Sequence, residues 1–298
     1  MTSTPDAPPT SFGPPAAAPP ALPVARRAPS MWRAAVLIFD LSLARMLWSR
    51  GTIFMALLVG LPVVLALLVR GVQAIGAPAM RIEGQVVTGP TIFGFMVWFL
   101  YLRFIVPVLA LYYGTALVAD EVEDKTITYL FTRPIRRGAV LLGKFLAYFV
   151  CTVMVVTPSL MVVYFLMGLS GATLAGTFPS LLKDLGLIVL GLLAYGGLFA
   201  WVGAQFKRPL VIGLVFVFGF EVAAMTIPGS MRYASVAFYL QSLVPHAVMG
   251  EGVLSLLQSL VQQKASLVTS VVMLVGIGVT FVFLAMRVIA RREYILEQ

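Results

Sequence analysis

Long uncharged stretches alternate with short charged segments along most of the chain. A bilayer core about 30 Å thick needs roughly 20 consecutive apolar residues per helix. Six stretches approach that length, so we expect six transmembrane helices, at residues 53–69, 93–119, 145–169, 185–202, 210–227 and 267–286. The fourth and fifth stretches are short for full crossings, and the second contains Arg103. The pattern predicts an all-α polytopic membrane protein.

Two segments outside these spans complete the predicted organisation. Residues 1–30 hold nine of the 19 prolines and lack the apolar content that would repay the entropy of ordering, so we predict a disordered cytoplasmic tail. Residues 31–298 then form one transmembrane domain. Its first part is apolar but interrupted and carries Trp32 and Trp48, which favours a helix lying in the inner interface over a simple extension of the first span.

A long outer segment, residues 228–266, separates the last two predicted spans. Apolar residues recur there at helical spacing between Val253 and Val261, which predicts a helix on the outer membrane surface. His246, the single histidine, lies in this segment and is interpreted as structural rather than as a ligand or proton carrier.

Composition agrees with a membrane protein and excludes several chemistries. Apolar residues make up 60% of the chain and charged residues 11%, which is far from the usual balance of a soluble domain. With Cys151 as the single cysteine and one histidine, the chain can form neither an internal disulfide nor a cysteine or multi-histidine metal centre.

The net charge of +9 is a topology signal. If the N-terminus is cytoplasmic, fifteen of the 21 Lys and Arg residues fall in inner segments, five in outer segments and one, Arg103, within a span. Positive residues concentrate on the cytoplasmic side of membrane proteins. We therefore predict a multi-pass protein of the cell's inner (cytoplasmic) membrane with both termini inside, and we expect no nucleic-acid partner.

The segment between the second and third predicted spans carries an ordered set of charges. Four acidic residues come first, in Asp120–Asp124, basic residues follow from Lys125 on, and Pro134 would stop the first helix before a second begins. Acids at the start of a helix and bases at its end suit the helix dipole, and proline stops a helix. A capped surface helix explains this order of charges, but it does not explain why a short charged helix is held between two spans.

This segment resembles the signature of the ABC type-2 exporter permeases. In that family an acidic residue, a Gly-Thr or Lys-Thr pair, leucines, an Arg-Pro step and a Gly-Lys pair precede the third span. The matching residues here are Glu121, Glu123, Lys125, Thr126, Leu130, Arg133, Pro134, Arg137, Gly143 and Lys144. Lys125 stands where many members have glycine. The six-span layout extends the resemblance over nearly all of the chain beyond residue 30.

The resemblance implies a function and its partners. The segment would be a cytoplasmic coupling helix that rests in a groove of a separate ABC-type ATPase subunit, with Glu121, Glu123, Thr126, Arg133, Pro134, Arg137 and Lys144 as the ATPase-coupling residues. A rigid element fixed to two spans can pass a rotation of the ATPase into the membrane. A second permease subunit, identical or paralogous, would complete the transporter in the lipid bilayer.

The chain itself is not expected to bind or hydrolyse ATP. Gly138–Lys144 fits the beginning of a P-loop, but Phe145 stands where the magnesium-binding hydroxyl belongs, and the stretch leads into a membrane span instead of following a buried strand. We expect no catalytic residue, cofactor or metal in this chain, with ATP and magnesium held by the partner subunit.

Two charged residues lie within predicted spans. Arg103 and Glu221 each stand three residues to the outer side of the midpoint of their span, so both lie roughly 4 to 5 Å beyond the bilayer centre. At that depth they could form an ion pair. The resemblance implies that this pair, with Tyr112 and Tyr113, lies beside the translocation path. The alternative is a structural pair that fixes helix packing.

The function predicted is therefore that of a membrane-spanning permease subunit of an ABC exporter. The alternative is an ion-coupled secondary carrier or channel that acts without an ATPase, for which we would expect inverted repeats and broken helices. An intramembrane enzyme would need facing carboxylates or a Ser/His or metal set, which Glu221 and His246 do not provide. The mostly apolar spans favour a hydrophobic or amphipathic cargo.

Overall fold

The computed structural model describes residues 31–47, 50–75, 81–82, 85–86, 88–123, 137–168, 174–226, 230–244 and 265–291. The predicted tail, most of the predicted coupling helix, the helix expected near residues 253–261 and His246 lie outside these ranges.

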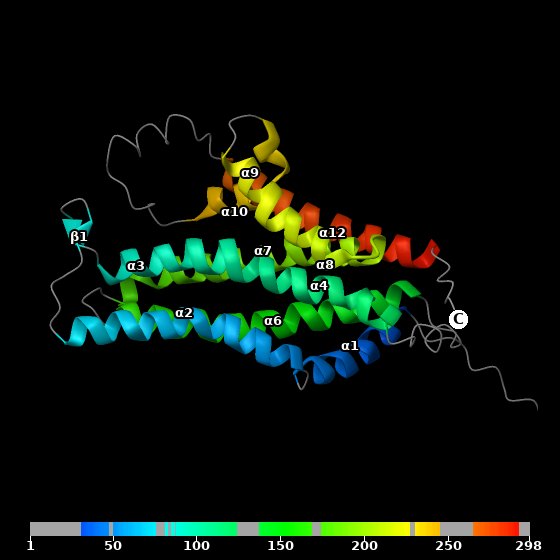
Figure 1. Ribbon diagram of the computed structural model, residues 1–298, viewed down its shortest axis with the longest axis horizontal. Coiled ribbons are helices and arrows are strands. Elements are labelled where there is room, and N and C mark those ends of the chain that lie inside the picture. The colour runs from blue at the N-terminus through cyan, green and yellow to red at the C-terminus, as the bar shows by residue number, and fades with distance from the viewer. Residues whose placement is uncertain are drawn as a thin grey trace, which may run out of the picture.

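Helices account for nearly all of the described chain (Figure 1). They are α1 (Met31–Leu47), α2 (Arg50–Ala74), α3 (Gly89–Phe95), the π-helix η1 (Met96–Ile105), α4 (Val106–Glu123), α6 (Arg137–Gly168), α7 (Leu174–Gln205), α8 (Pro209–Val215), the π-helix η2 (Phe216–Phe220), α9 (Glu221–Thr226), the 3₁₀ helix η3 (Ser230–Ala234), α10 (Val236–Leu243) and α12 (Leu267–Arg291). A two-stranded hairpin, β1 (Arg81–Ile82) and β2 (Gln85–Val86), follows α2.

Five helical stretches are long and apolar enough to cross a membrane: Gly51–Ala74, Gly89–Leu117, Gly138–Gly168, Thr177–Gln205 and Leu267–Arg291. The prediction of an all-α multi-pass membrane protein is confirmed. The predicted fifth span corresponds to a shorter apolar helix, Pro209–Met225, formed by α8, η2 and α9. Its 17 residues would extend for about 26 Å at 1.5 Å per residue, slightly less than a bilayer core.

The fourth span is longer than its uncharged stretch. The prediction began at residue 185 because Lys183 and Asp184 precede it, yet α7 starts at Leu174 and runs through both. Asp184 is fully buried. A buried polar residue of a long helix can therefore be mistaken for the edge of a span when only the sequence is read.

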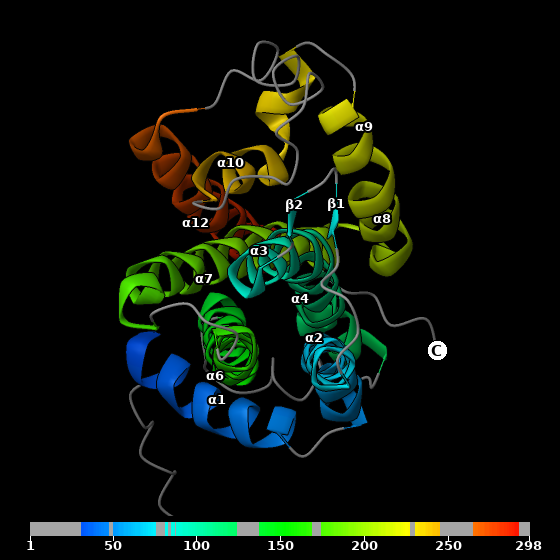
Figure 2. The ribbon, with the colours of Figure 1, turned by 90° about the vertical axis from the view of Figure 1, so that its left-hand side faces the viewer.

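Helix α7 occupies the centre of the bundle. It packs against α4, α6 and α12, and Figure 2 shows it passing between α6 on one side and α10 and α12 on the other. Small residues allow the closest approach: a Cβ on Gly197 of α7 would lie 2.4 Å from the carbonyl oxygen of Gly278 in α12. Association of helices in a membrane depends on such close packing, since water does not drive them together.

Buried hydroxyl groups tie several helices together. The Tyr101 hydroxyl of η1 lies 2.7 Å from the Ser159 hydroxyl of α6, which donates at 2.8 Å to the Val59 carbonyl of α2. Pro62 and Pro158 interrupt the backbone hydrogen bonding of the same two helices nearby. Side-chain donors that reach across helices are one way in which membrane helices satisfy carbonyl groups near prolines.

Helix α1 lies against the start of α6. It buries Ala35, and a Cβ on Gly143 of α6 would lie 2.5 Å from the Ala35 carbonyl oxygen. Val36, Leu37 and Leu41 stay more than half exposed. The helix expected between residues 31 and 50 is thus present, with an apolar face open to lipid, and Gly143 of the Gly-Lys pair is required for its close contact.

Candidate functional site

Two π-helical segments mark the region around the intramembrane charges. Arg103 lies in η1, and Glu221 is the first residue after η2. The rings of Phe104 and Phe218 meet edge-on between the two segments, with centroids 6.4 Å apart. π-Helical turns are rare in proteins and occur frequently at functional sites. The candidate site therefore consists of η1, η2 and the residues that contact them.

Glu221 is a buried carboxylate with a complete set of donors. It is 4% exposed, and it accepts hydrogen bonds from the backbone of Val236 to Oε1 at 3.0 Å and of Ala237 to Oε2 at 3.2 Å. The Ser235 hydroxyl donates to Oε2 at 2.5 Å. The hydroxyl of Tyr195, in α7, lies beside the same carboxylate as a further donor.

These bonds place the carboxylate at the N-terminus of α10. Ser235 is the N-cap of that helix, and its hydroxyl also accepts from the Phe238 backbone at 3.3 Å. Free backbone N–H groups and the helix dipole both favour an anion at such a terminus. Both oxygens of Glu221 act as acceptors of N–H groups, which a carboxylate can do and an amide cannot.

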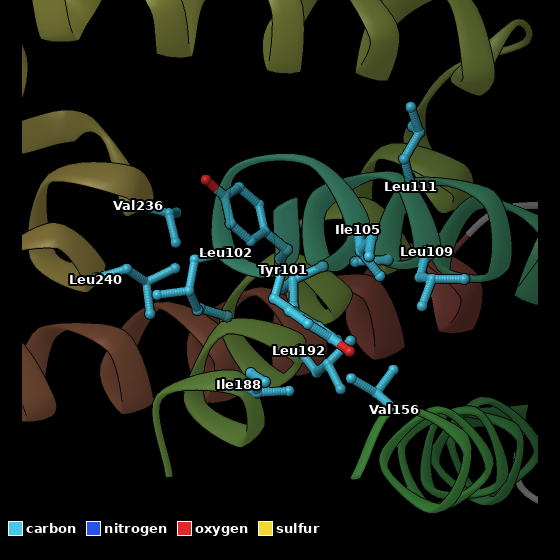
Figure 3. Packing of buried hydrophobic residues seen from close by; sticks show 14 of the residues in the cluster. Tyr101, Leu102, Ile105, Leu109, Leu111, Val156, Ile188, Leu192, Val236 and Leu240 are labelled. Carbon is cyan, nitrogen blue, oxygen red and sulfur yellow. The ribbon is translucent and has the colours of Figure 1, made fainter. Parts of the chain in front are cut away.

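Helix α10 contacts several parts of the bundle at once. It packs against α12, α7, α9 and η1. In Figure 3, Val236 and Leu240 of α10 lie beside Leu102 of η1 and Ile188 of α7. Glu221 thus fixes the position of a short helix that packs against four other elements.

The structure does not bring Arg103 and Glu221 together as an ion pair. Within the described part of the chain, Glu221 is bonded to α10 and Tyr195 instead. The physical reason is that the start of a helix supplies several N–H donors at fixed positions, and these satisfy both carboxylate oxygens. Arg103 lies within electrostatic range of Tyr195 but forms neither a hydrogen bond nor an ion pair with any described residue.

Tyr112 and Tyr113 lie elsewhere, in the middle part of α4. The Tyr113 hydroxyl donates to the Gly51 carbonyl of α2 at 2.7 Å, and the Tyr112 ring packs on Phe54 with centroids 4.9 Å apart. The two tyrosines therefore hold the start of α2. They are separated from Arg103 by nine residues or more of the same helical stretch.

The tyrosine pair provides a matched test of this contact. We expect Tyr113→Phe to lower the free energy of unfolding by about 1 kcal/mol, because it removes one intramolecular hydrogen bond. Tyr112→Phe should change it little, since the Tyr112 ring contacts remain. Thermal unfolding can be followed with a thiol-reactive fluorophore, because Cys151 is fully buried in the folded state. Equal shifts in the two variants would contradict a role of the Tyr113 hydroxyl.

The predicted ATPase-coupling residues flank or lie outside the described chain. Glu121 and Glu123 end α4 and Arg137 begins α6, but their side chains lie outside the described residues, as do Thr126, Arg133 and Pro134 entirely. Lys144 is half-buried in α6, next to Gly143. The structure places the end of the second span and the start of the third at the two ends of the charged segment, and the coupling role of its residues stays a prediction.

Sequence reasoning missed three residues that the structure brings into contact with the site or the core. Ser235 and Tyr195 complete the surroundings of Glu221, and Asp184 is the second fully buried acid. An N-cap serine before an apolar run is a known helix-start signal and could have identified Ser235. Tyr195 has no such signal, because its partner comes from a different helix.

The fold and this site define a multi-pass α-helical membrane protein with a polar cluster at the start of the short helix α10. The sequence model of the ABC-2 family transporter protein matches residues 42–292. The chain therefore belongs to the ABC-2 family, whose members are membrane subunits of ABC transporters and work with ABC ATPase subunits. A comparison with curated proteins finds no match.

Proposed function

We propose that this chain is the permease subunit of an ATP-driven exporter. Two such subunits, identical or paralogous, span the inner membrane with their termini in the cytoplasm, and a separate ATPase subunit binds ATP and magnesium. The observation that carries the proposal is the charged segment 120–144, which joins two spans of a protein of the ABC-2 family.

The connection of this segment to the bundle supports a coupling role. It begins at the end of α4 and enters α6, and both helices pack against α7 at the centre of the bundle. Helix α1 lies on α6 at Gly143, one residue before Lys144. A force on the segment would thus act directly on the second and third spans and, through α6, on α1. Rigid-body movement of packed elements is a common way to transmit such a force.

Co-purification of the ATPase tests the proposal. We expect the tagged chain, extracted from its own membranes in mild detergent, to carry a cassette-type ATPase that hydrolyses ATP. Glu121→Ala combined with Glu123→Ala should lose it, because docking charges are removed. The matched control is Glu293→Ala with Glu297→Ala, which removes the same charge from the C-terminal end and should keep the ATPase.

Two outcomes would contradict the proposal. If no nucleotide-hydrolysing partner accompanies the wild-type chain, a carrier or channel that acts alone becomes the better reading. If the control pair loses the ATPase as fully as the test pair, general charge rather than this segment holds the partner.

A further inference from the structure

Arg103 lies at the centre of a membrane span. The helical stretch Gly89–Leu117 has 29 residues, with 14 on either side of Arg103. At about 1.5 Å per residue, each end of the stretch is roughly 20 Å away. An arginine side chain can reach the interface only from positions near a helix end. The guanidinium of Arg103 therefore needs an anionic or strongly polar partner within the membrane.

The described chain does not supply that partner. Arg103 is half-buried, and it forms no hydrogen bond or ion pair with any described residue. The five helices long enough to cross the membrane and the shorter apolar helix Pro209–Met225 together contain two acidic residues, Asp184 and Glu221. Both are buried, at 0% and 4% exposure, and the donors of α10 occupy the Glu221 carboxylate. The Glu221 carboxylate is thus hydrogen-bonded to donors other than Arg103.

The described membrane helices of a second copy do not supply the partner either. The exposed side chains of the described membrane helices include no acid, because Asp184 and Glu221 are both buried. Two copies that met along η1 would bring two arginines together without a counter-charge. Within the described residues, neither this chain nor a second copy supplies the anion, which points to a different molecule as its source.

The surroundings of Arg103 indicate what kind of molecule this is. Phe95, Phe99 and Phe104 of the same stretch are 46%, 46% and 37% exposed, and Phe218 of η2 adds a further exposed ring beside Phe104. Phe95 and Phe99 stack with centroids 5.6 Å apart. Phe99 and Phe95 precede Arg103 by four and eight residues, so helical spacing places their rings on the same face as the guanidinium. Such a surface suits a ligand that has an apolar body and one acidic group.

We propose that Arg103 binds the acidic group of the transported substrate, and that this substrate is an amphipathic anion bearing a carboxylate or phosphate. A guanidinium pairs with either group through two parallel hydrogen bonds. The inference rests on the proposed transport function. It names the substrate class of that transporter and assigns Arg103 as the residue that selects it.

A binding experiment with two matched probes tests the inference. Dibrominated stearate and its methyl ester have the same apolar body, and bromine quenches the fluorescence of nearby tryptophan. Trp98 lies in η1, with its ring 6.1 Å from that of Phe99, so it reports on this surface. The purified transporter is placed in phosphatidylcholine nanodiscs, which contain no anionic lipid. Trp98→Phe shows how much of the quenching arises at this site.

The expected result is that the Arg103→Gln variant loses its preference for the acid over the ester. Wild-type protein should bind stearate about 10- to 100-fold more tightly than the ester, the range of a charge-assisted hydrogen-bonded pair. Arg103→Gln should remove this preference and leave binding of the ester unchanged. Arg103→Lys should retain part of this preference, because the positive charge remains but the planar guanidinium, which can form two parallel hydrogen bonds, is lost. Arg70→Gln is the matched control, since Arg70 lies in α2 and bonds Gln73.

Three outcomes would overturn the inference. Equal affinity of wild-type protein for both probes would show that the surface does not select anions. Equal loss of both probes in Arg103→Gln would show a structural role. Separation of the two permease subunits by Arg103→Gln, observed by native mass spectrometry, would place the counter-charge in a paralogous subunit.

A further arm separates a transported substrate from a resident lipid. With the co-purified ATPase present, ATP should change the affinity for stearate at least several-fold if the site belongs to the transport path. An affinity that ATP does not change would indicate a fixed structural lipid and would overturn the assignment to the substrate. If no ATPase co-purifies, the proposed transport function fails by that result alone, while the probe comparison still decides whether Arg103 selects an anion.

Discussion

Glu221→Gln is expected to release α10 from the bundle and to lower the free energy of unfolding by about 3 kcal/mol. In either orientation of the amide, its NH₂ group would face a backbone N–H, of Val236 or of Ala237, because both carboxylate oxygens now accept such a bond. Buried donors left without acceptors cost about 1 to 3 kcal/mol each. Loss of the negative charge at the helix N-terminus adds to this cost.

Two measurements check this prediction. The first is thermal unfolding followed at Cys151. The second uses Leu240→Cys as a local reporter, because Leu240 is 1% exposed where α10 packs. A water-soluble maleimide should label this cysteine slowly in the Glu221 background and much faster with Glu221→Gln. Ser235→Ala should have a smaller effect in the same direction. Ser242→Ala is the control, since the Ser242 hydroxyl donates to the Phe238 carbonyl within α10 and accepts only a long bond, 3.4 Å, from the Ala265 backbone outside it.

The prediction distinguishes a carboxylate that holds α10 in place, here called an anchor, from an ordinary buried acid. If Glu221→Gln unfolds like the wild type and leaves Leu240→Cys protected, the carboxylate does not hold α10. An anchor of this kind would make α10 follow any movement of α9, and through it affect α7, η1 and α12, which all contact α10.

Gly197→Ala is expected to disrupt the contact between α7 and α12 and to lower stability by about 1 to 3 kcal/mol, the usual cost of overpacking. A Cβ at this position would lie 2.4 Å from the Gly278 carbonyl oxygen, and backbone atoms cannot rotate away as a side chain does. The helices would have to separate along the most extensive contact of the bundle. Unfolding temperature and the yield of folded protein in detergent report the change.

The same helix provides the control. A Cβ on Gly186 meets no atom within 4 Å, so Gly186→Ala should leave stability unchanged or raise it, since alanine favours a helix by up to about 1 kcal/mol over glycine. The comparison removes the general effect of replacing glycine in α7. Similar losses in both variants would mean that close backbone contact is not what requires Gly197.

The sequence determined the helices because their formation depends on local physics. An uncharged run of sufficient length has no stable alternative to a helix in a membrane, and five of the six predicted stretches coincide with helices long enough to cross it. The exceptions have clear causes. Lys183 and Asp184 interrupt the apolar pattern in the N-terminal part of α7, and the fifth stretch forms a shorter helix that ends before η3 and α10.

The family was also readable from the sequence. A short ordered set of charges and turn residues between two spans carried the resemblance, and the match over residues 42–292 confirmed it. The roles of Glu121, Glu123, Thr126, Arg133, Pro134, Arg137 and Lys144 stay predictions, because they depend on an ATPase surface that a single chain does not contain.

Only the tertiary structure decided how the polar residues within the membrane are paired. Judged by their depth in the membrane alone, Arg103 and Glu221 were suitable partners. The hydrophobicity pattern indicates how deep a residue lies, but it does not indicate toward which neighbouring helix the side chain points. The fold brought Ser235 and the start of α10 to Glu221 from 14 to 16 residues further along the chain, and it placed Tyr113 on Gly51 of another helix. The length of an apolar stretch can be counted directly along the sequence. The partner of a buried charge, in contrast, depends on which helix ends meet in the folded protein.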